Sequence, residues 1–298
     1  MALKKFLMVG FVAAVLVACG DDNSDFATRP TGDSSSACED CDDSSSSKAK
    51  SSSSVASSSS GEQSSSSVAY VEPCRNDSVD TCEYGTLTDE RDGQTYKTVK
   101  IGTQTWMAEN LNYAYTGVPY NYSGSTSDST SWCYSNAAAN CTKYGRLYTW
   151  AAAMDSVGTW SANGKGCGYG KTCSPTYPVR GICPEGWHLP DTTEWHTLFT
   201  AVGGKSTAGK MLKSTSGWNS SGNGTDAYSF SALPAGYRYS HGNFILEGYY
   251  AAFCSSSESY SNGAYHMYLD SSYDSARLDG DYKDLGFSVR CVKDLQAE

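Results

Sequence analysis

Apolar residues recur at helical spacing in the second half of the chain, just after residue 190. The positions follow i, i+3, i+4 and i+7, the spacing of one buried face of an α-helix. They are Trp195, Leu198, Phe199 and Val202. Asp191 stands where an N-cap belongs, and Glu194 follows three residues later, as in a capping box. We therefore predict a helix that is capped by Asp191 and ended by Gly203–Gly204, with His196 at its solvent edge.

Two further helices are predicted. The first lies within residues 140–157, where the same spacing occurs, and the second is a short turn or helix at 208–214. The apolar positions of the first are Leu147, Trp150, Ala151 and Met154.

The rest of the pattern consists of short alternations that are typical of strands. Residues 96–111 predict a hairpin with its turn near Gly102, and residues 228–258 predict several strands. A closing strand is expected at 286–294, with Phe287, Val289 and Cys291 on one face. Helices and strands do not alternate, so the pattern predicts an α+β fold that is irregular and loop-rich, with few helices and short antiparallel strands.

The N-terminal segment, residues 1–18, has the pattern of an export signal. Lys4 and Lys5 precede the apolar run Phe6–Val17, which is too short to span a bilayer comfortably. Residues 16–19, Leu-Val-Ala-Cys, resemble the bacterial lipobox, which implies cleavage before Cys19 and lipidation of that residue. The alternative is an ordinary signal peptide followed by a chance cysteine. The first interpretation predicts an exported protein that is anchored by lipid in the bacterial envelope, at the outer membrane or cell surface.

A serine tract follows the leader. Residues 44–67 contain four blocks of four serines, which bury too little apolar surface to offset the entropy of ordering. We expect residues 19–72 to be a disordered tether and residues 73–298 to be one globular head.

Net charge restricts the partners. The formal charge is −10, and it becomes −12 without residues 1–18, because these contain two lysines and no acids. The remaining basic residues are scattered, so no nucleic-acid partner is expected.

The chain has twelve cysteines. With Cys19 set aside, eleven remain, so at least one cannot pair within the chain. In an exported protein, four close pairs suggest disulfides. They are Cys38 with Cys41, Cys74 with Cys82, Cys133 with Cys141, and Cys167 with Cys173. Only the first pair has metal-ligand spacing, and no second pair accompanies it, so no zinc site is expected.

The densest group of reactive side chains is CPEGWHLPDTTEWH, residues 183–196. His188 and His196 are eight residues apart, whereas the compact helical zinc motif needs two histidines four apart. Because Asp191 and Glu194 fit a capping box, we interpret this stretch as the start of a helix. There is no Gly-x-Ser-x-Gly elbow, and we predict no catalytic and no metal-ligating residue.

A group of acidic residues could supply oxygen ligands to a structural calcium ion. The simpler interpretation is a solvated acidic surface. The group consists of residues 222–226 (GNGTD), Asp270, Asp274, Asp279, Asp281 and Asp284. None of these forms an EF-hand loop.

Aromatic residues suggest a ligand-binding surface. The chain has 22 tyrosines and seven tryptophans, with concentrations at 113–132 and 237–244. Such rings stack on sugars, and binding residues are often on loops. The candidate ligand-binding residues are Tyr120, Tyr122, Trp132, Tyr237, Arg238 and His241. Alternatively, the tyrosines are the amphipathic cover of a loop-rich fold.

Several phrases occur in a family-specific order, among them TVKIGTQTWMAENLNY, WCYSNAAANCTKYGRLYTWAAAM, GICPEGWHLPDTTEW, GNGTDAYSFSALPAGYR and GFSVRCVKD. Over about residues 86–294 the chain resembles the Fibrobacter succinogenes major paralogous domain. That domain is similar to the formylglycine-generating sulfatase-modifying factors, whose fold is related to C-type lectins. The resemblance implies an irregular, disulfide-containing α+β head but no known activity.

The resemblance also bears on the remaining cysteines. Family members usually carry tryptophan at the position of Cys254, which makes Cys254 the predicted free thiol, either beside a cavity or reactive. Analogy with lectin-like folds then pairs Cys183 with Cys291. The alternative pairs Cys254 with Cys291.

The sequence therefore predicts a lipid-anchored surface protein whose head is a non-enzymatic binding module. Its expected partners are the lipid bilayer, through Cys19, and a polysaccharide or another surface protein. One alternative is an oxidoreductase of the formylglycine-generating type, which needs two neighbouring cysteines in the C-terminal third, where only Cys254 and Cys291 occur. A purely structural envelope protein is the other.

Overall fold

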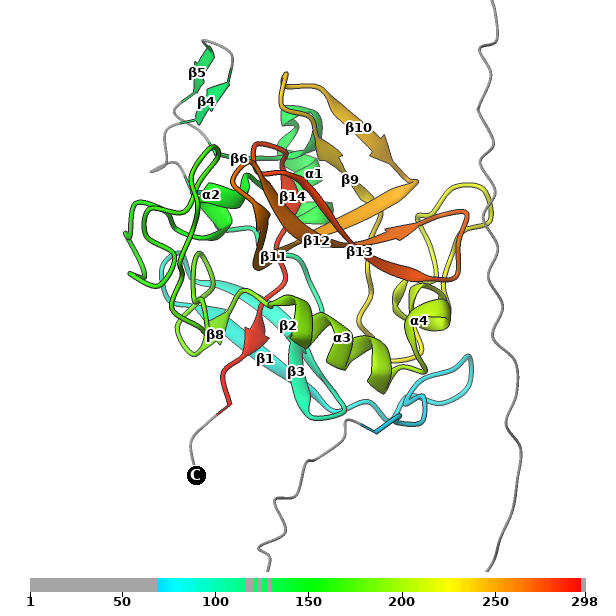
Figure 1. The fold of residues 1–298 in the computed structure, drawn as a ribbon. Helices are drawn as coiled ribbons and strands as arrows, with labels where there is room; N and C mark the ends of the chain where they lie inside the picture. Colours follow the sequence, from blue (N-terminus) through cyan, green and yellow to red (C-terminus); the bar gives the residue numbers. More distant parts are fainter. Residues whose placement is uncertain (1–68, 116–119, 123–124, 128–129, 296–298) are drawn as a thin grey trace, which may run out of the picture. The chain divides into compact units, whose positions relative to one another are not determined.

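The computed structural model describes residues 69–115, 120–122, 125–127 and 130–295 (Figure 1). The chain divides into two units, 1–62 and 63–298, and all the described residues belong to the second. The predicted leader, Cys19, the serine tract and the pair Cys38 and Cys41 lie outside the described residues. None of the helices in the described part is long and apolar enough to cross a membrane.

Strands outnumber helices, and they form two larger sheets and one small hairpin. The first sheet has the order β1-β2-β3-β15-β8. Its strands are β1 (Tyr84–Asp89), β2 (Gln94–Ile101), β3 (Gln104–Met107), β8 (Trp187–His188) and β15 (Val292–Lys293). The hairpin pairs β4 (Tyr120–Tyr122) with β5 (Ser125–Ser127).

The second sheet has the order β10-β9-β11-β14-β7-β6, and β12 and β13 continue from β11. Its strands are β6 (Ser131–Trp132), β7 (Leu147–Tyr148), β9 (Ala235–Arg238), β10 (Phe244–Glu247), β11 (Tyr250–Tyr260), β12 (Gly263–Asp270), β13 (Ala276–Tyr282) and β14 (Phe287–Ser288). Pairing is mostly antiparallel, but β11 runs parallel to β9 and to β14.

Four short α-helices occur among the described residues. They are α1 (Ala138–Tyr144), α2 (Trp150–Ala153), α3 (Thr192–Ala201) and α4 (Lys205–Leu212), and a single 3-10 turn, η1 (Tyr134–Asn136), precedes α1. A mixed fold of many short strands, few helices and several disulfides confirms the predicted α+β class.

Helix α3 forms as its sequence predicts. The Asp191 carboxylate accepts from the Glu194 backbone N–H at 2.8 Å, and the Glu194 carboxylate accepts from the Asp191 N–H at 2.9 Å, which completes the capping box. The predicted apolar face is buried and His196 is exposed. Figure 1 shows α3 between the cyan strands β1–β3 and the orange strands β11–β13. There Trp195 stacks on Trp106 at a ring-centre distance of 4.7 Å. Helix α3 is therefore a central part of the core.

Two predicted elements are wrong in detail. The expected helix within 140–157 is interrupted, because α1 ends at Gly145 with φ of 73°, Leu147 lies on β7, and α2 starts after its cap Thr149. The expected closing strand is split into β14 and β15, which belong to different sheets. Its three predicted core residues still share one hydrophobic cluster. The hairpin at 96–111 and the short third helix are confirmed as β2–β3 and α4.

Four disulfides connect loops to this framework. They are Cys74–Cys82, Cys133–Cys141, Cys167–Cys173 and Cys183–Cys291. The first three join cysteines that are close in sequence, whereas Cys183–Cys291 spans 108 residues and ties the segment before β8 to the one before β15. Both cysteines of the long bridge are fully buried.

Cys254 is the free cysteine of the described residues. Its side chain is buried on β11, and burial raises the pKa of its thiol to about 12. A thiol that is both inaccessible and protonated at neutral pH is a poor nucleophile. Cys254 thus occupies the core as a small apolar residue.

Candidate functional site

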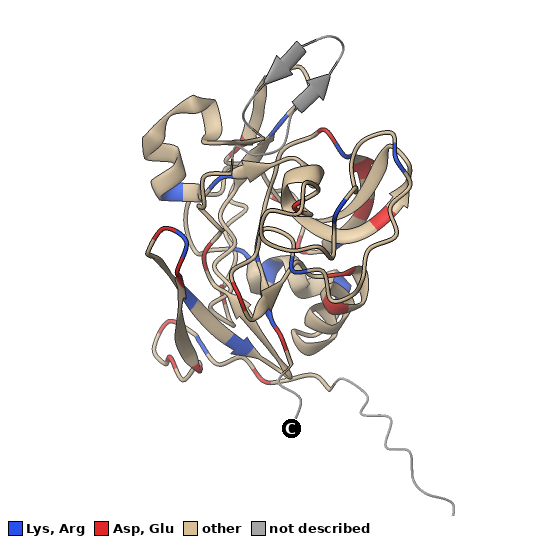
Figure 2. Ribbon diagram, turned by 90° about the vertical axis from the view of Figure 1, so that its left-hand side faces the viewer, with Lys and Arg blue, Asp and Glu red and all other residues tan. Residues whose placement is uncertain are grey.

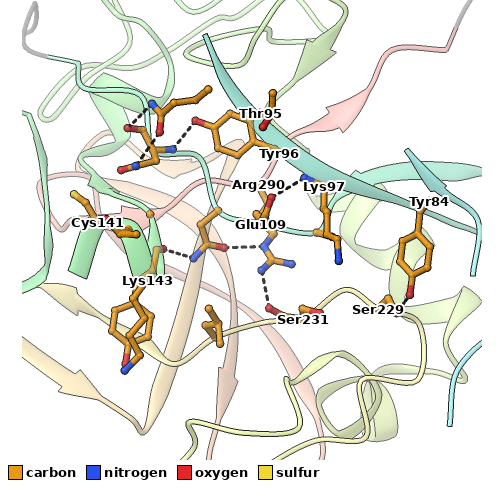
Figure 3. Close-up of a pocket in the computed structure, with 18 of the residues that line it drawn as sticks. Tyr84, Thr95, Tyr96, Lys97, Glu109, Cys141, Lys143, Ser229, Ser231 and Arg290 are labelled. Atoms are coloured by element: carbon orange, nitrogen blue, oxygen red, sulfur yellow. Dashed lines mark hydrogen bonds between the residues drawn. The ribbon is translucent and has the colours of Figure 1, made fainter. Parts of the chain in front are cut away.

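A pocket of about 570 Å³ lies between the β1–β2 hairpin and the end of α1 (Figure 3). Five separate segments line it, at residues 75–84, 94–97, 108–112, 141–145 and 229–233, together with Arg290. Its lining combines amides, hydroxyls, tyrosines and charged side chains. They are Gln94, Asn110, Asn112, Thr95, Thr142, Ser229, Ser231, Tyr84, Tyr96, Tyr144, Arg75, Lys97, Lys143, Glu109 and Arg290.

Arg290 forms part of the pocket's floor and is about 1% exposed. Its guanidinium donates to Asn110 Oδ1 at 2.7 Å, to Ser231 O at 2.9 Å and to the carbonyl oxygen of Phe230. Burial lowers the pKa of Arg290 to about 9. No carboxylate among the described residues lies within ion-pair distance of it. A buried cation therefore faces the pocket with only neutral acceptors.

Asn110 connects this floor to α1. Its Nδ2 donates to Tyr144 O at 2.7 Å, so one side chain holds both Arg290 and the end of the helix. Gly145 then turns the chain with φ of 73°, and a Cβ there would lie 2.8 Å from Leu111 O. A glycine is required at this position, because any larger residue would push α1 away from the floor.

Tyr96, on strand β2, lines the same side of the pocket as the amides of Gln94 and Asn112. The Asn112 backbone N–H donates to Tyr96 Oη at 3.1 Å, and Asn112 Nδ2 donates to Gln94 Oε1 at 2.9 Å. Burial raises the pKa of Tyr96, so its hydroxyl stays neutral at physiological pH. The wall is therefore a fixed set of neutral hydrogen-bonding groups.

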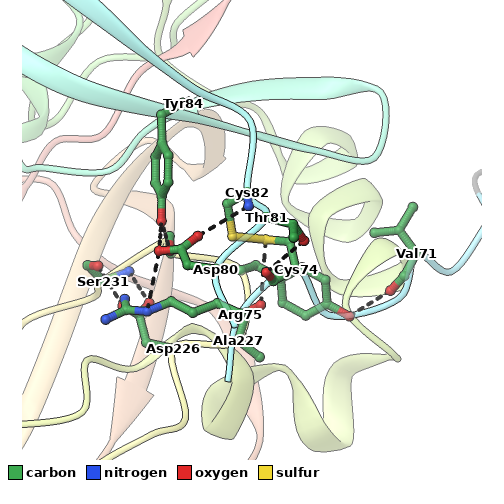
Figure 4. Close-up of a disulfide and its surroundings, with 12 residues drawn as sticks. Val71, Cys74, Arg75, Asp80, Thr81, Cys82, Tyr84, Asp226, Ala227 and Ser231 are labelled. Atoms are coloured by element: carbon green, nitrogen blue, oxygen red, sulfur yellow. Dashed lines mark hydrogen bonds and ion pairs between the residues drawn. A yellow bond between two sulfur atoms is a disulfide. The ribbon is translucent and has the colours of Figure 1, made fainter. Parts of the chain in front are cut away.

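Tyr84 stands at the rim on the other side of the pocket (Figure 3), and Figure 4 shows it beside the Cys74–Cys82 disulfide. Its side chain is 45% exposed, and its hydroxyl donates to Asp80 Oδ2 at 2.7 Å and lies 2.6 Å from Ser229 Oγ. The Cys74–Cys82 disulfide closes the loop that carries Asp80. Arg75 in this loop pairs with Asp226 at 2.7 Å. A covalent bridge and an ion pair therefore fix the position of the rim.

The ligand-binding residues predicted from the sequence lie elsewhere. Arg238 covers the ring of buried Trp132 at 3.9 Å, and His241 contacts Tyr239 at a ring-centre distance of 5.4 Å. Tyr237 packs among aromatic rings of the second sheet, at 5.8 Å from Tyr250. None of these residues lines the 570 Å³ pocket. Tyr120 and Tyr122 lie on β4, but their side chains are outside the description.

His188 in the stretch 183–196 has two acidic neighbours. Its Nε2 lies 2.6 Å from Glu194 Oε1 and its Nδ1 lies 2.5 Å from Asp294 Oδ1. The imidazole therefore links the start of α3 to the C-terminal segment after β15. The sequence predicts Glu194 as part of the cap but does not reveal the contact of His188 with Asp294, because Asp294 is 106 residues away.

The contacts of His188 predict a pH-dependent stability. Burial by itself lowers the pKa of His188, but Glu194 and Asp294 outweigh it, and the pKa is raised above its ordinary value of about 6.5. A raised folded-state pKa stabilises the fold below the unfolded pKa, and this contribution is lost as pH rises through the folded pKa. Urea unfolding of the wild type should therefore show a loss of stability above about pH 6.5 that His188→Gln lacks.

His196→Gln is the matched control, because His196 is exposed on the same helix. This variant should keep the wild-type dependence on pH. If His188→Gln and the wild type lost stability in parallel above neutrality, the proposed linkage would be wrong.

The described residues contain no group of three or more His, Cys, Asp or Glu side chains that could hold a metal ion. Asp226, from the acidic segment 222–226, accepts hydrogen bonds from the Arg75 side chain and from the backbone N–H and the hydroxyl of Ser231. Figure 2 shows acidic and basic residues interspersed over the visible face, without a basic stripe.

A family model described as the Fibrobacter succinogenes major domain matches residues 99–293. The chain therefore belongs to this family. No curated protein and no solved structure matches the chain, so its similarity to sulfatase-modifying factors and C-type lectins stays a prediction. The pocket wall at residues 75–97 precedes the matched region, whereas the rest of the lining falls inside it.

Proposed function

We propose that the head is a non-enzymatic glycan-binding module, carried on a tether and anchored to the bacterial envelope through a lipid on Cys19. The observation that supports binding is the pocket between β1–β2 and α1. Its volume of about 570 Å³ lies within the range of small-molecule sites, and its amides and hydroxyls match the donors and acceptors of a sugar.

The lining argues for binding rather than catalysis. No histidine lines the pocket, and its one cysteine, Cys141, is in a disulfide. A serine or threonine there has no imidazole beside it to act as a base. The oxidoreductase alternative needs a reactive pair of thiols, but the described residues offer one free thiol, Cys254, which is buried. The pocket thus has the groups for recognition and lacks both a serine beside a histidine and a reactive thiol.

Tyr84 provides the test of this site. We expect the protein with Cys19→Ser, which keeps tether and head but carries no lipid, to be retained on insoluble glycans such as cellulose or xylan. Tyr84→Ala should weaken retention about tenfold, because an aromatic side chain at a binding site contributes on the order of 1–2 kcal/mol. Affinity electrophoresis in soluble glycans would measure the change.

Tyr282→Ala is the matched control, because Tyr282 is 50% exposed on β13 and does not line the pocket. It should bind as the wild type does. Absence of retention on every glycan tested would reject glycan binding, and equal loss in both variants would reject this pocket as the site.

A further inference from the structure

The charges at the pocket differ in sign from those of the chain as a whole. The chain carries −10, yet four cations line the pocket against a single carboxylate, that of Glu109. Two of the cations already have carboxylate partners outside the lining. Arg75 pairs with Asp226 at 2.7 Å, and Lys143 lies 4.0 Å from Glu247.

The other two cations have no carboxylate within ion-pair distance among the described residues. Arg290 is buried and donates to neutral oxygens only. Lys97 is exposed on β2, and its Nζ lies 5.8 Å from the centre of the Tyr84 ring. Figure 3 shows them arriving from different elements, Lys97 from the β2 strand and Arg290 from the C-terminal part of the chain. Glu109 is engaged by the backbone, since its Oε2 accepts from the Lys97 N–H at 2.6 Å.

Because Arg290 is out of water, salt screens its field less than that of a surface charge. Buried cations in proteins are usually paired with anions, whereas Arg290 makes no direct ion pair with a described carboxylate and is influenced by Asp226 and Glu109 only from a longer distance. A carboxylate that enters the pocket would meet Lys97 at the rim and the field of Arg290 at the floor. Neutral amides and hydroxyls around it are suited to hydroxyl groups on the same molecule.

We infer that the pocket binds a saccharide that carries a carboxylate, that is, a uronic acid unit, with Lys97 as the direct partner of the carboxylate. This inference rests on the proposed glycan-binding function and specifies its ligand class. The ring of exposed Tyr84 beside Lys97 would contact the sugar face, and the Gln94 and Asn112 amides would contact its hydroxyls.

The test compares an oligogalacturonate with its methyl ester, titrated calorimetrically into the Cys19→Ser protein. The two ligands differ in charge but hardly in shape. We expect the acid to bind about tenfold more tightly at low salt, and this advantage to shrink in about 0.5 M sodium chloride. Lys97→Met should remove most of the preference for the acid and leave binding of the ester nearly unchanged.

Lys100→Met is the matched control. Lys100 is also on β2 and exposed, but it pairs with Glu83 at 3.3 Å and does not line the pocket. It should bind both ligands as the wild type does.

Equal affinity for acid and ester, or an equal effect of Lys97→Met on both, would overturn the inference while glycan binding stands. Binding of a neutral glycan such as cellulose without binding of the oligogalacturonate would do the same. If no glycan binds at all, the proposed function and this inference fail together.

Discussion

Replacing Cys183 and Cys291 together by alanine is expected to lower the free energy of unfolding by about 4–5 kcal/mol. The bridge closes a loop of 108 residues, and the cost of cross-linking the unfolded chain rises with the logarithm of loop length. The bridge also joins the segment before β8 to the segment before β15. Urea unfolding of the oxidised double variant, followed by tryptophan fluorescence, would measure the loss.

The double variant Cys74→Ala/Cys82→Ala is the control, since its bridge spans only eight residues. The chain-entropy account then expects a smaller loss, about 2–3 kcal/mol. Should the short bridge cost as much as the long one, loop length would not be the cause of the stabilisation.

Local patterns predicted the elements whose determinants lie within a few residues. Asp191 and Glu194 specify the start of α3 by contacts three residues apart, and the apolar face of α3 is visible as a period. The prediction of one helix within 140–157 was wrong, because a strand and a short helix in succession give the same apolar spacing as a single helix. Gly145 ends α1 with a positive-φ turn, and Thr149 is the N-cap of α2. Neither boundary is evident from the apolar spacing alone.

The pocket could not be predicted in the same way. Its floor joins Asn110 to Arg290 across 180 residues, and its rim joins Tyr84 to Ser229 across 145. No spacing in the sequence encodes such contacts, which arise only when the first sheet and the 229–233 loop are assembled. The tyrosine-rich segments 113–132 and 237–244 were predicted as binding loops because their composition is evident from the sequence. Tyr237 and Trp132 pack against neighbouring side chains and do not line the pocket, and a role for them in binding stays a prediction.

Lys283 makes long-range contacts, and its replacement is the second change for which we expect a large loss of stability. Its side chain is fully buried, and its Nζ donates to the carbonyl oxygens of Gly168, Lys171 and Ser261 and to the Glu258 carboxylate. The ammonium also lies 4.5 Å from the centre of the Trp150 ring. One charge therefore holds the loop of the Cys167–Cys173 disulfide against β11.

Lys283→Met is expected to destabilise the fold by about 3–5 kcal/mol, because it leaves the Glu258 carboxylate without its cation. For a head of this size, that corresponds to a drop in the melting temperature of roughly 10 °C. Methionine is unbranched and only one atom shorter than lysine, so the loss reports mainly the charge and its hydrogen bonds rather than a cavity. Differential scanning calorimetry of the oxidised protein would measure the change.

Two further variants test whether the Lys283–Glu258 ion pair is responsible for the loss of stability. Lys293→Met removes an exposed lysine and should leave the melting temperature within a degree or two, since an exposed charge contributes little. Lys283→Met combined with Glu258→Gln should recover part of the loss, because the second change removes the uncompensated charge that the first one creates. Cys173 N–H, which donates to Glu258 at 3.0 Å, keeps an amide oxygen as its acceptor in that double variant. If the double variant were no more stable than Lys283→Met alone, the carbonyl oxygens of Gly168, Lys171 and Ser261, rather than the carboxylate, would be the groups that require the ammonium.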